Sequence, residues 1–296
     1  MRSFLLALAL FLSSCAAAQS ADTELTPTAD NGETFGQVLA EYQALNARLQ
    51  QVAYRIQSAN TYICPVTSYD IGITVHLISD YPEEIQPIAR ALLGATEKLS
   101  IRTVRPGSPA DLAGLKPADV IIRLGENYLP SGPTVKKLYE SYQQSAQTNF
   151  RLTVKRAEIR TDYTLKPEKL CGYPVNVFFA DHINGHTDGQ EIWITSELMH
   201  TVADDVNLAL IVAHEMFHAI DDHVNQVPSK QLELEADRMA LIMIEKAGYN
   251  IERAVDYWQY APHPHGSGQP GSMTHPTMGE RLNNFRKTLR EIRASD

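Results

Sequence analysis

The 296-residue chain has little of what would place it in several common classes. It has no run of lysine and arginine, and its formal net charge is −9, which excludes a protein that holds nucleic-acid phosphates through basic side chains. After its N-terminal region it has no stretch of about 18 or more apolar residues, so we expect no membrane-spanning helix in the mature protein. The length and the 44% hydrophobic content are compatible with two globular domains.

Cysteine is also scarce, with three residues at positions 15, 64 and 171. Residues 1–18 combine a basic start, an apolar run and small residues, a pattern typical of a secretory signal peptide. The stretch LSSC at 12–15 resembles a bacterial lipobox, which implies that Cys15 is lipidated. AAAQ, directly after it, also suits ordinary cleavage. We therefore expect an exported, periplasmic protein, either free or anchored to the outer membrane by an N-terminal lipid, its only expected membrane contact.

The composition and the hydrophobic periodicity of the rest of the chain change several times. Residues 19–33 are polar without periodicity and predict a flexible tether. Residues 34–63 have apolar residues at helical spacing, which predicts an amphipathic helix. Residues 64–171 contain short alternating strands with helical stretches between them, and residues 172–296 contain two strands followed by long helices. This order predicts an α+β fold, in which a β-rich domain interrupts a mainly helical one.

The inserted segment resembles a known domain. VRPGSPADLAGLKPADVIIRLG, residues 104–125, resembles the PDZ domains of bacterial proteases, and YDIGITV resembles their carboxylate-binding loop, centred on Ile71, Gly72 and Ile73. The resemblance implies that a peptide adds to the following strand while backbone N–H groups of the loop hold its C-terminal carboxylate. The chain departs from the family at Ala118, where glycine is usual, and in an insertion before the next strand. The alternative is a rigid spacer domain that binds nothing.

The strongest chemical signal is the stretch AHEMFHAID. His214 and His218 share one face of a helix that we expect over residues 205–223, and Glu215 stands beside them. This is the HExxH arrangement of zinc peptidases, whose histidines bind the metal and whose glutamate activates water. The alternative is a helix with polar residues and no metal.

A catalytic zinc needs a third protein ligand and one open position. The helix predicted for QLELEADRMALIMIEKAGYN offers Glu233, Glu235 and Asp237. Glu233 and Asp237 share the face that also carries apolar residues, whereas Glu235 points elsewhere. We expect Glu233 to complete a site for one Zn²⁺ per chain, and Asp237 to accept a hydrogen bond from a ligating histidine. The alternative is that both are solvated surface charges.

HExxH followed by ELEAD resembles the CAAX prenyl endopeptidase and HtpX-like family of gluzincin metallopeptidases, here in a soluble, exported form. THPTMGERL near the end resembles the family's His-Pro…Arg motif. The resemblance implies that His275 either stabilises the oxyanion or occupies the open zinc position at rest. It implies that Arg281 holds a loop or the site carboxylates. We expect His263 and His265, in the preceding loop, to be surface residues.

Cys64 and Cys171 flank the inserted domain, whose two chain crossings must lie close together. The expected compartment preserves disulfides, so we predict a Cys64–Cys171 bond, with two buried thiols as the alternative.

The predicted function is zinc-dependent hydrolysis of peptide bonds in protein substrates at the cell envelope, in protein quality control. We expect the PDZ domain to recognise a substrate or partner, and the strand EIWIT at 191–195 to hold the substrate backbone. The alternatives are an envelope chaperone or PDZ-based scaffold with a non-catalytic zinc site. Glu215 separates them from a peptidase, because a protein that only binds has no need of this carboxylate.

Overall fold

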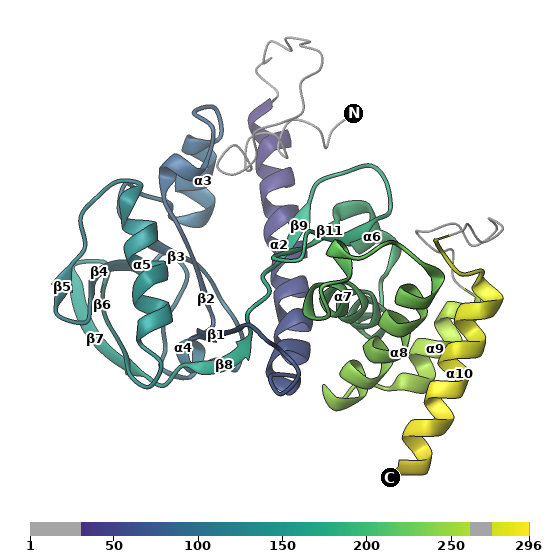
Figure 1. Ribbon diagram of the computed structural model, residues 1–296. Helices are drawn as coiled ribbons and strands as arrows, with labels where there is room; N and C mark the ends of the chain where they lie inside the picture. Colours follow the sequence, from purple (N-terminus) through teal and green to yellow (C-terminus); the bar gives the residue numbers. More distant parts are fainter. Residues whose placement is uncertain (1–30, 261–273, 296) are drawn as a thin grey trace. The chain divides into compact units, whose positions relative to one another are not determined.

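The computed structural model describes residues 31–260 and 274–295 (Figure 1). The predictions for Cys15, His263 and His265 concern residues outside this range. The chain forms two compact units. Of the described residues, unit 1 contains 31–47 together with Tyr69–Glu168, and unit 2 contains Arg48–Ser68 together with 169–260 and 274–295.

Helix α2 (Asn31–Ala59) contains the predicted amphipathic helix. In unit 1 its buried Leu39 packs in a cluster with Ile85 and Ala89. In unit 2 its buried apolar residues lie between Leu49 and Ile56. Since α2 supplies residues to both units, the assignment of the whole helix to the peptidase domain stays a prediction.

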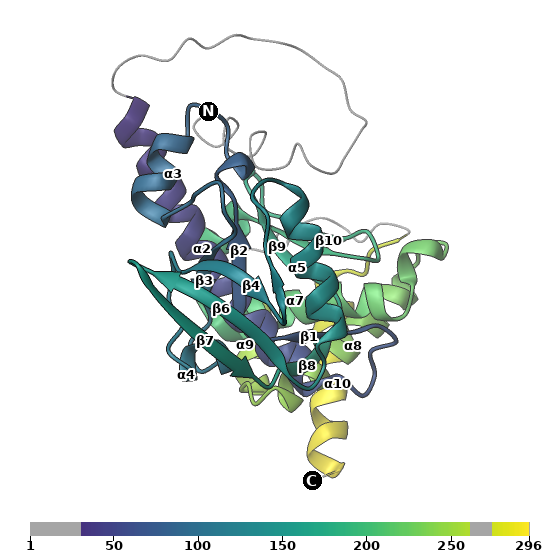
Figure 2. The same cartoon turned by 90° about the vertical axis from the view of Figure 1, so that its left-hand side faces the viewer.

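Unit 1 is built on an antiparallel sheet that α5 (Thr134–Ser145) covers with its buried residues Val135 and Tyr139 (Figures 1 and 2). The strand order is β2 (Ile73–His76), β3 (Ser100–Val104), β4 (Val120–Leu124), β6 (Phe150–Arg156) and β7 (Ile159–Leu165), with β5 (Asn127–Tyr128) beside β4. The remaining elements are η1 (Ile78–Asp80), α3 (Gln86–Leu93) and α4 (Pro109–Leu112). The insertion noted in the sequence therefore forms η1 and α3 between β2 and β3.

Ala118 stands where PDZ domains usually have glycine, and its φ of 68° lies in the left-handed region that favours glycine. The chain accommodates its side chain through a second position. A Cβ atom added at Gly94 would lie 2.4 Å from the Cβ atom of Ala118, so the glycine leaves this space open.

Unit 2 contains a three-stranded sheet in the order β10 (Gly185–Thr187), β11 (Ile192–Thr195) and β9 (Val175–Phe178). β11 pairs with β9 in parallel and with β10 in antiparallel orientation. The expectation that residues 191–195 hold the substrate backbone is therefore wrong, because β11 has a strand on each side. Among the strands that the structure describes, β10 pairs with β11 alone, so β10 is an edge of this sheet.

Helices complete unit 2. They are α6 (Ser196–Thr201), α7 (Asp205–Ile220), η2 (His223–Asn225), α8 (Lys230–Lys246), α9 (Ile251–Tyr260) and α10 (Met278–Ser295). α7 contacts β10 and β11 as well as α8 and α9, so it lies between the sheet and the other helices (Figure 1). Within the described ranges no helix is both long and apolar enough to span a membrane. The predicted α+β fold is confirmed.

The strand β1 (Thr67–Asp70) pairs with β8 (Glu168–Cys171). A disulfide joins Cys64 to Cys171, the last residue of β8, with 5.5 Å between the two Cα atoms. The two cysteines are 107 positions apart in the sequence. The bond therefore ties the chain leaving α2 to the chain that returns to unit 2.

Candidate metal centre

Helix α7 holds the HExxH residues on a buried element. It begins after Asp204, whose carboxylate accepts a hydrogen bond from the N–H of Val206 at 2.8 Å. It ends at Ile220, three residues before the end predicted from the sequence, because Asp222 adopts a left-handed conformation with φ of 53°. The chain therefore turns back, and His223 lies in η2 instead of continuing the helix.

Helix α8 supplies the acidic residues. Ser229 accepts a hydrogen bond from the N–H of Leu232, which starts the helix, and Gly248 follows its end with a φ of 75°. Glu233 lies in the first turn of α8. Because α7 and α8 pack together, this first turn faces the two histidines.

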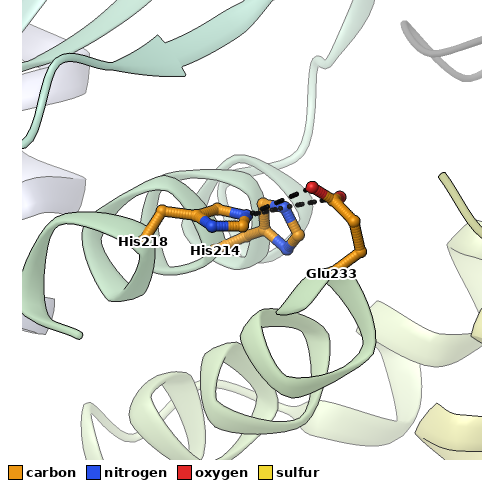
Figure 3. A group of neighbouring side chains, drawn as sticks. All are labelled: His214, His218 and Glu233. Carbon is orange, nitrogen blue, oxygen red and sulfur yellow. Dashed lines mark hydrogen bonds and ion pairs between the residues drawn. The ribbon is translucent and has the colours of Figure 1, made fainter. Parts of the chain in front are cut away.

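His214, His218 and Glu233 point toward one another from the two helices (Figure 3). Nε2 of His214 lies 3.6 Å from Oε2 of Glu233, and Nε2 of His218 lies 3.6 Å from Oε1. The two Nε2 atoms are 3.0 Å apart. Three donor atoms that converge in this way fit a single zinc ion, since two imidazoles and a carboxylate form a usual catalytic zinc set.

Asp237 and Arg281 stand behind His214. Oδ1 of Asp237 lies 3.1 Å from Nδ1 of His214, on the side of the ring away from Glu233. Arg281 donates to Asp237 through Nε at 2.7 Å and also through Nη2, and its guanidinium lies 4.5 Å from the ring centre of Trp258. Arg281 therefore holds a site carboxylate, one of the two roles that the resemblance implied.

The charged groups of this cluster shift one another's pKa values. Burial alone would lower the pKa of His214, but its contacts with Asp237 and Glu233 raise it to about 9. Burial and the neighbouring His214 lower the pKa of His218 to about 3. Burial would raise the pKa of Glu233 and of Asp237. The neighbouring His214 instead lowers the pKa of Glu233 to about 2. Arg281 and His214 together lower the pKa of Asp237 to about 2. In the metal-free site at neutral pH, His214 is therefore a protonated imidazolium between the carboxylates of Glu233 and Asp237, and His218 is neutral.

Glu215 does not join the ligand group, although it follows His214 directly. It is 7% exposed, and burial raises the pKa of its carboxyl group. A Cβ atom added at Gly185 would lie 3.4 Å from Cγ of Glu215, so glycine at this position of β10 leaves room beside the glutamate. Glu215 and Gly185 of the edge strand both line the pocket that the metal-ligand group borders.

These residues line one open pocket. The zinc-ligand candidates, Glu215 and His275 all border it, as do the edge strand β10 and η2. His275 is exposed, and its Nδ1 lies 2.9 Å from Oγ1 of Thr274. Val224, Pro228 and Leu232 provide an apolar part of the wall. His275 thus lies at the same pocket as the predicted ligands.

His223 was not predicted from the sequence. Its Nδ1 lies 3.0 Å from Nδ1 of His218, and its Nε2 lies 3.1 Å from Oδ2 of Asp221. Its side chain is 2% exposed. The signal in the sequence is a third histidine five residues after His218, inside the helix predicted over residues 205–223. His223 contacts His218 because α7 ends early, at Ile220.

The predicted carboxylate-binding loop lies in unit 1. The N–H of Gly72 donates to Oδ1 of Asp70 at 2.8 Å, and the N–H of Arg105 donates to the carbonyl oxygen of Gly72 at 2.8 Å. Arg105 also pairs with Asp70 and with Glu168. The Gly72 N–H that the resemblance assigns to a ligand therefore has an acceptor within the chain, and ligand binding by Ile71, Gly72 and Ile73 stays a prediction.

Comparison with known proteins gives two family matches. The model of a PDZ domain matches residues 100–156, and the model of peptidase family M48 matches residues 226–289. The second match contains Glu233, Asp237, His275 and Arg281, and it starts after the HExxH helix.

Among solved structures, the chain is similar to the crystal structure of the HtrA3 PDZ domain bound to a phage-derived ligand, FGRWV. The identity is 19%, the match covers 36% of this chain and 93% of that one, and the TM-score is 0.28. In the comparison with curated proteins, nothing matches. The family matches confirm the resemblance found in the sequence: this chain combines a PDZ domain with an M48-type peptidase region.

Proposed function

We propose that the chain is a zinc-dependent endopeptidase of the bacterial cell envelope that cleaves protein substrates in quality control. The observation that carries the proposal is the convergence of His214, His218 and Glu233 beside Glu215 in an open pocket. The M48 match supports peptidase activity. The signal-peptide pattern of residues 1–18 supports export, with Cys15 as the lipid anchor.

When bound, zinc supplies Lewis-acid chemistry, which polarises a carbonyl group and makes a water molecule more acidic. Glu215 then takes a proton from the attacking water and passes it to the leaving amine. Its raised pKa suits a group that must hold this proton between the two steps. His275, at the same pocket, donates a hydrogen bond to the developing oxyanion.

The edge strand β10 is the proposed place for the substrate backbone. The N–H of Thr195 donates to the carbonyl oxygen of Asn184, and the N–H of Asp188 donates to the carbonyl oxygen of Glu191. The residues that flank β10 on both sides therefore bond toward the chain of β11. Alternation along an antiparallel strand then directs the backbone groups of Gly185 and Thr187 to the open edge. An extended peptide can pair with these groups beside Glu215.

The pocket wall suggests a preference among peptides. Val224, Pro228 and Leu232 are apolar residues that line the pocket holding the zinc ligands. Val224 is 39% exposed, so burial against a substrate side chain would remove apolar surface from water. We propose that substrates carry an apolar side chain next to the cleaved bond.

For the PDZ domain we propose peptide binding along β2, an edge strand of its sheet within the described residues. The carboxylate of Asp70 already accepts the hydrogen bond from Gly72. A peptide with a free C-terminus must displace it, whereas an internal peptide segment need not.

Casein hydrolysis and zinc content of wild type and Glu215→Gln test the peptidase proposal. We expect the variant to keep zinc and to lose hydrolysis, because it keeps every ligand and lacks the base. Glu245→Gln, on α8 but not among the residues that line the pocket, is the matched control and should behave as wild type. If wild type binds zinc and partners without cleaving casein, the alternative of an envelope chaperone or scaffold is favoured.

A further inference from the structure

A second group of metal-binding side chains lies next to the first. Asp221, His223 and Glu235 each offer one ligand atom, and these atoms lie within 4.8 Å of one another. Asp221 comes from the end of α7, His223 from η2 and Glu235 from α8. His223 is buried, while the two carboxylates are exposed. One imidazole and two carboxylates suit a borderline divalent ion such as Zn²⁺.

The loop that carries this group is held in place by its own hydrogen bonds. Nε2 of Gln226 donates to the carbonyl oxygen of Asp221 at 3.0 Å, and Nδ2 of Asn225 donates to Oδ1 of Asp222 at 2.7 Å. The ring of His223 also packs edge-on against Phe217, with 5.5 Å between ring centres. These contacts hold Asp221 and His223 in place, and Glu235 approaches them from α8.

The two groups are connected through the ring nitrogens of His218 and His223. If Nε2 of His218 binds zinc, the hydrogen of this neutral ring is on Nδ1. Nδ1 faces Nδ1 of His223 at 3.0 Å, which must then be an acceptor. The hydrogen of His223 is consequently on Nε2, where Oδ2 of Asp221 accepts it at 3.1 Å. Occupation of the first site thus requires a hydrogen on the atom that the second site needs as a ligand.

The reverse case creates a conflict. A metal on Nε2 of His223 places the hydrogen of that ring on Nδ1. Two N–H groups would then face each other at the 3.0 Å contact, with no acceptor between them. His218 can relieve this only by moving its hydrogen to Nε2, which removes it as a zinc ligand, or by turning its ring away.

We propose that Asp221, His223 and Glu235 form a second, weaker zinc site, whose occupation opposes metal binding by His214, His218 and Glu233. This deepens the proposed function, on which it rests, because it makes the peptidase sensitive to excess zinc. Binding at the second site is weaker because two of its three ligands are exposed to water.

The first test measures zinc binding and does not depend on peptidase activity. In Glu233→Gln, which lacks a ligand of the first site, equilibrium dialysis should still show one bound zinc, and Glu233→Gln/Glu235→Gln should lose it. The affinity lost should exceed about tenfold, the effect that even an outer partner of a ligand has. Equal zinc binding by the single and double variants would overturn the second site, whatever the protein hydrolyses.

The second test measures how free zinc, at controlled concentrations, inhibits the hydrolysis of casein. Wild type should be most active at one zinc per chain and lose activity as free zinc rises. Glu235→Gln should match wild type at one zinc, and its inhibition should need more than about tenfold higher free zinc. Identical inhibition curves for the two proteins, or no inhibition of wild type, would overturn the coupling. Lack of hydrolysis at every zinc concentration would instead count against the peptidase proposal.

Discussion

The carboxylate of Asp237 lies 3.1 Å from Nδ1 of His214, on the side of the ring opposite to the metal-ligand group. Asp237 is 1% exposed and is itself held by Arg281. An acceptor in this position keeps the hydrogen of His214 on Nδ1 and leaves Nε2 available for zinc. The orientation of the histidine therefore depends on a residue that does not bind the metal.

From this contact we expect Asp237→Ala to weaken zinc binding by about 10- to 100-fold. Competition with a chromophoric chelator measures the effect. Glu245→Gln, on the same helix, is the control and should leave zinc affinity unchanged. Wild-type affinity in Asp237→Ala would show that packing alone orients His214.

Zinc affinity should also depend on pH. In the metal-free protein the pKa of His214 is about 9, whereas that of Glu233 is about 2, so zinc must displace a proton from the histidine and none from the glutamate. We expect affinity to rise by about tenfold per pH unit up to about pH 9. Calorimetry in buffers of different ionisation enthalpy measures the proton release. An affinity that stays constant between neutral pH and pH 9 would contradict the assigned proton.

The same shift affects the stability of the metal-free protein. The pKa of His214 is raised from its ordinary value of 6.5 to about 9, so the folded protein binds the proton more tightly than the unfolded chain. This stabilising contribution is complete below about pH 6.5 and is lost as the pH rises toward 9. Urea unfolding of the metal-free protein across this range should show a declining free energy of unfolding, and His214→Gln should decline less.

His275→Ala should lower kcat by about 10²- to 10³-fold with zinc retained, as the loss of an oxyanion donor does. The reason is that His214, His218 and Glu233 form a ligand group without it, while it borders the same pocket. His182→Ala, an exposed histidine outside the pocket lining, is the control. Increased activity in His275→Ala would instead identify a histidine that occupies the open zinc position at rest.

The first site could be predicted because helical periodicity alone brings residues four apart onto one face. This applies to His214 with His218 and to Glu233 with Asp237. The contact between His223 and His218 could not be predicted in this way. It requires the chain to leave α7 at a left-handed aspartate, Asp222, which is a local conformation that apolar periodicity does not report.

The sheet shows a similar limit. The sequence predicts a strand at residues 191–195, which contain β11, but β10 consists of only three residues, too few to show an alternating pattern. The pairing of β10 with β11 depends on tertiary contacts, and the sequence of so short a strand does not indicate which strand it pairs with. The sequence therefore indicates β11 but not its neighbour β10. For this reason it assigns the substrate backbone to β11, although β10 forms the edge of the sheet.

The position of β10 at the edge of the sheet leads to a prediction about Thr187. The backbone N–H of Thr187 faces away from β11 by the alternation of the ladder, so a proline at this position removes a donor for the substrate without removing one from the sheet. We expect Thr187→Pro to lower kcat/KM for peptide substrates, mainly through a higher KM, with zinc content unchanged. The Oγ1 of Thr187 also donates to the carbonyl oxygen of Glu191 at 2.7 Å, so Thr187→Val is the matched control: it loses this hydroxyl and keeps the N–H. If the valine and proline variants lose kcat/KM equally, the turn after β10 matters and the edge does not. If only the proline variant is impaired, an extended substrate pairs with β10 beside Glu215.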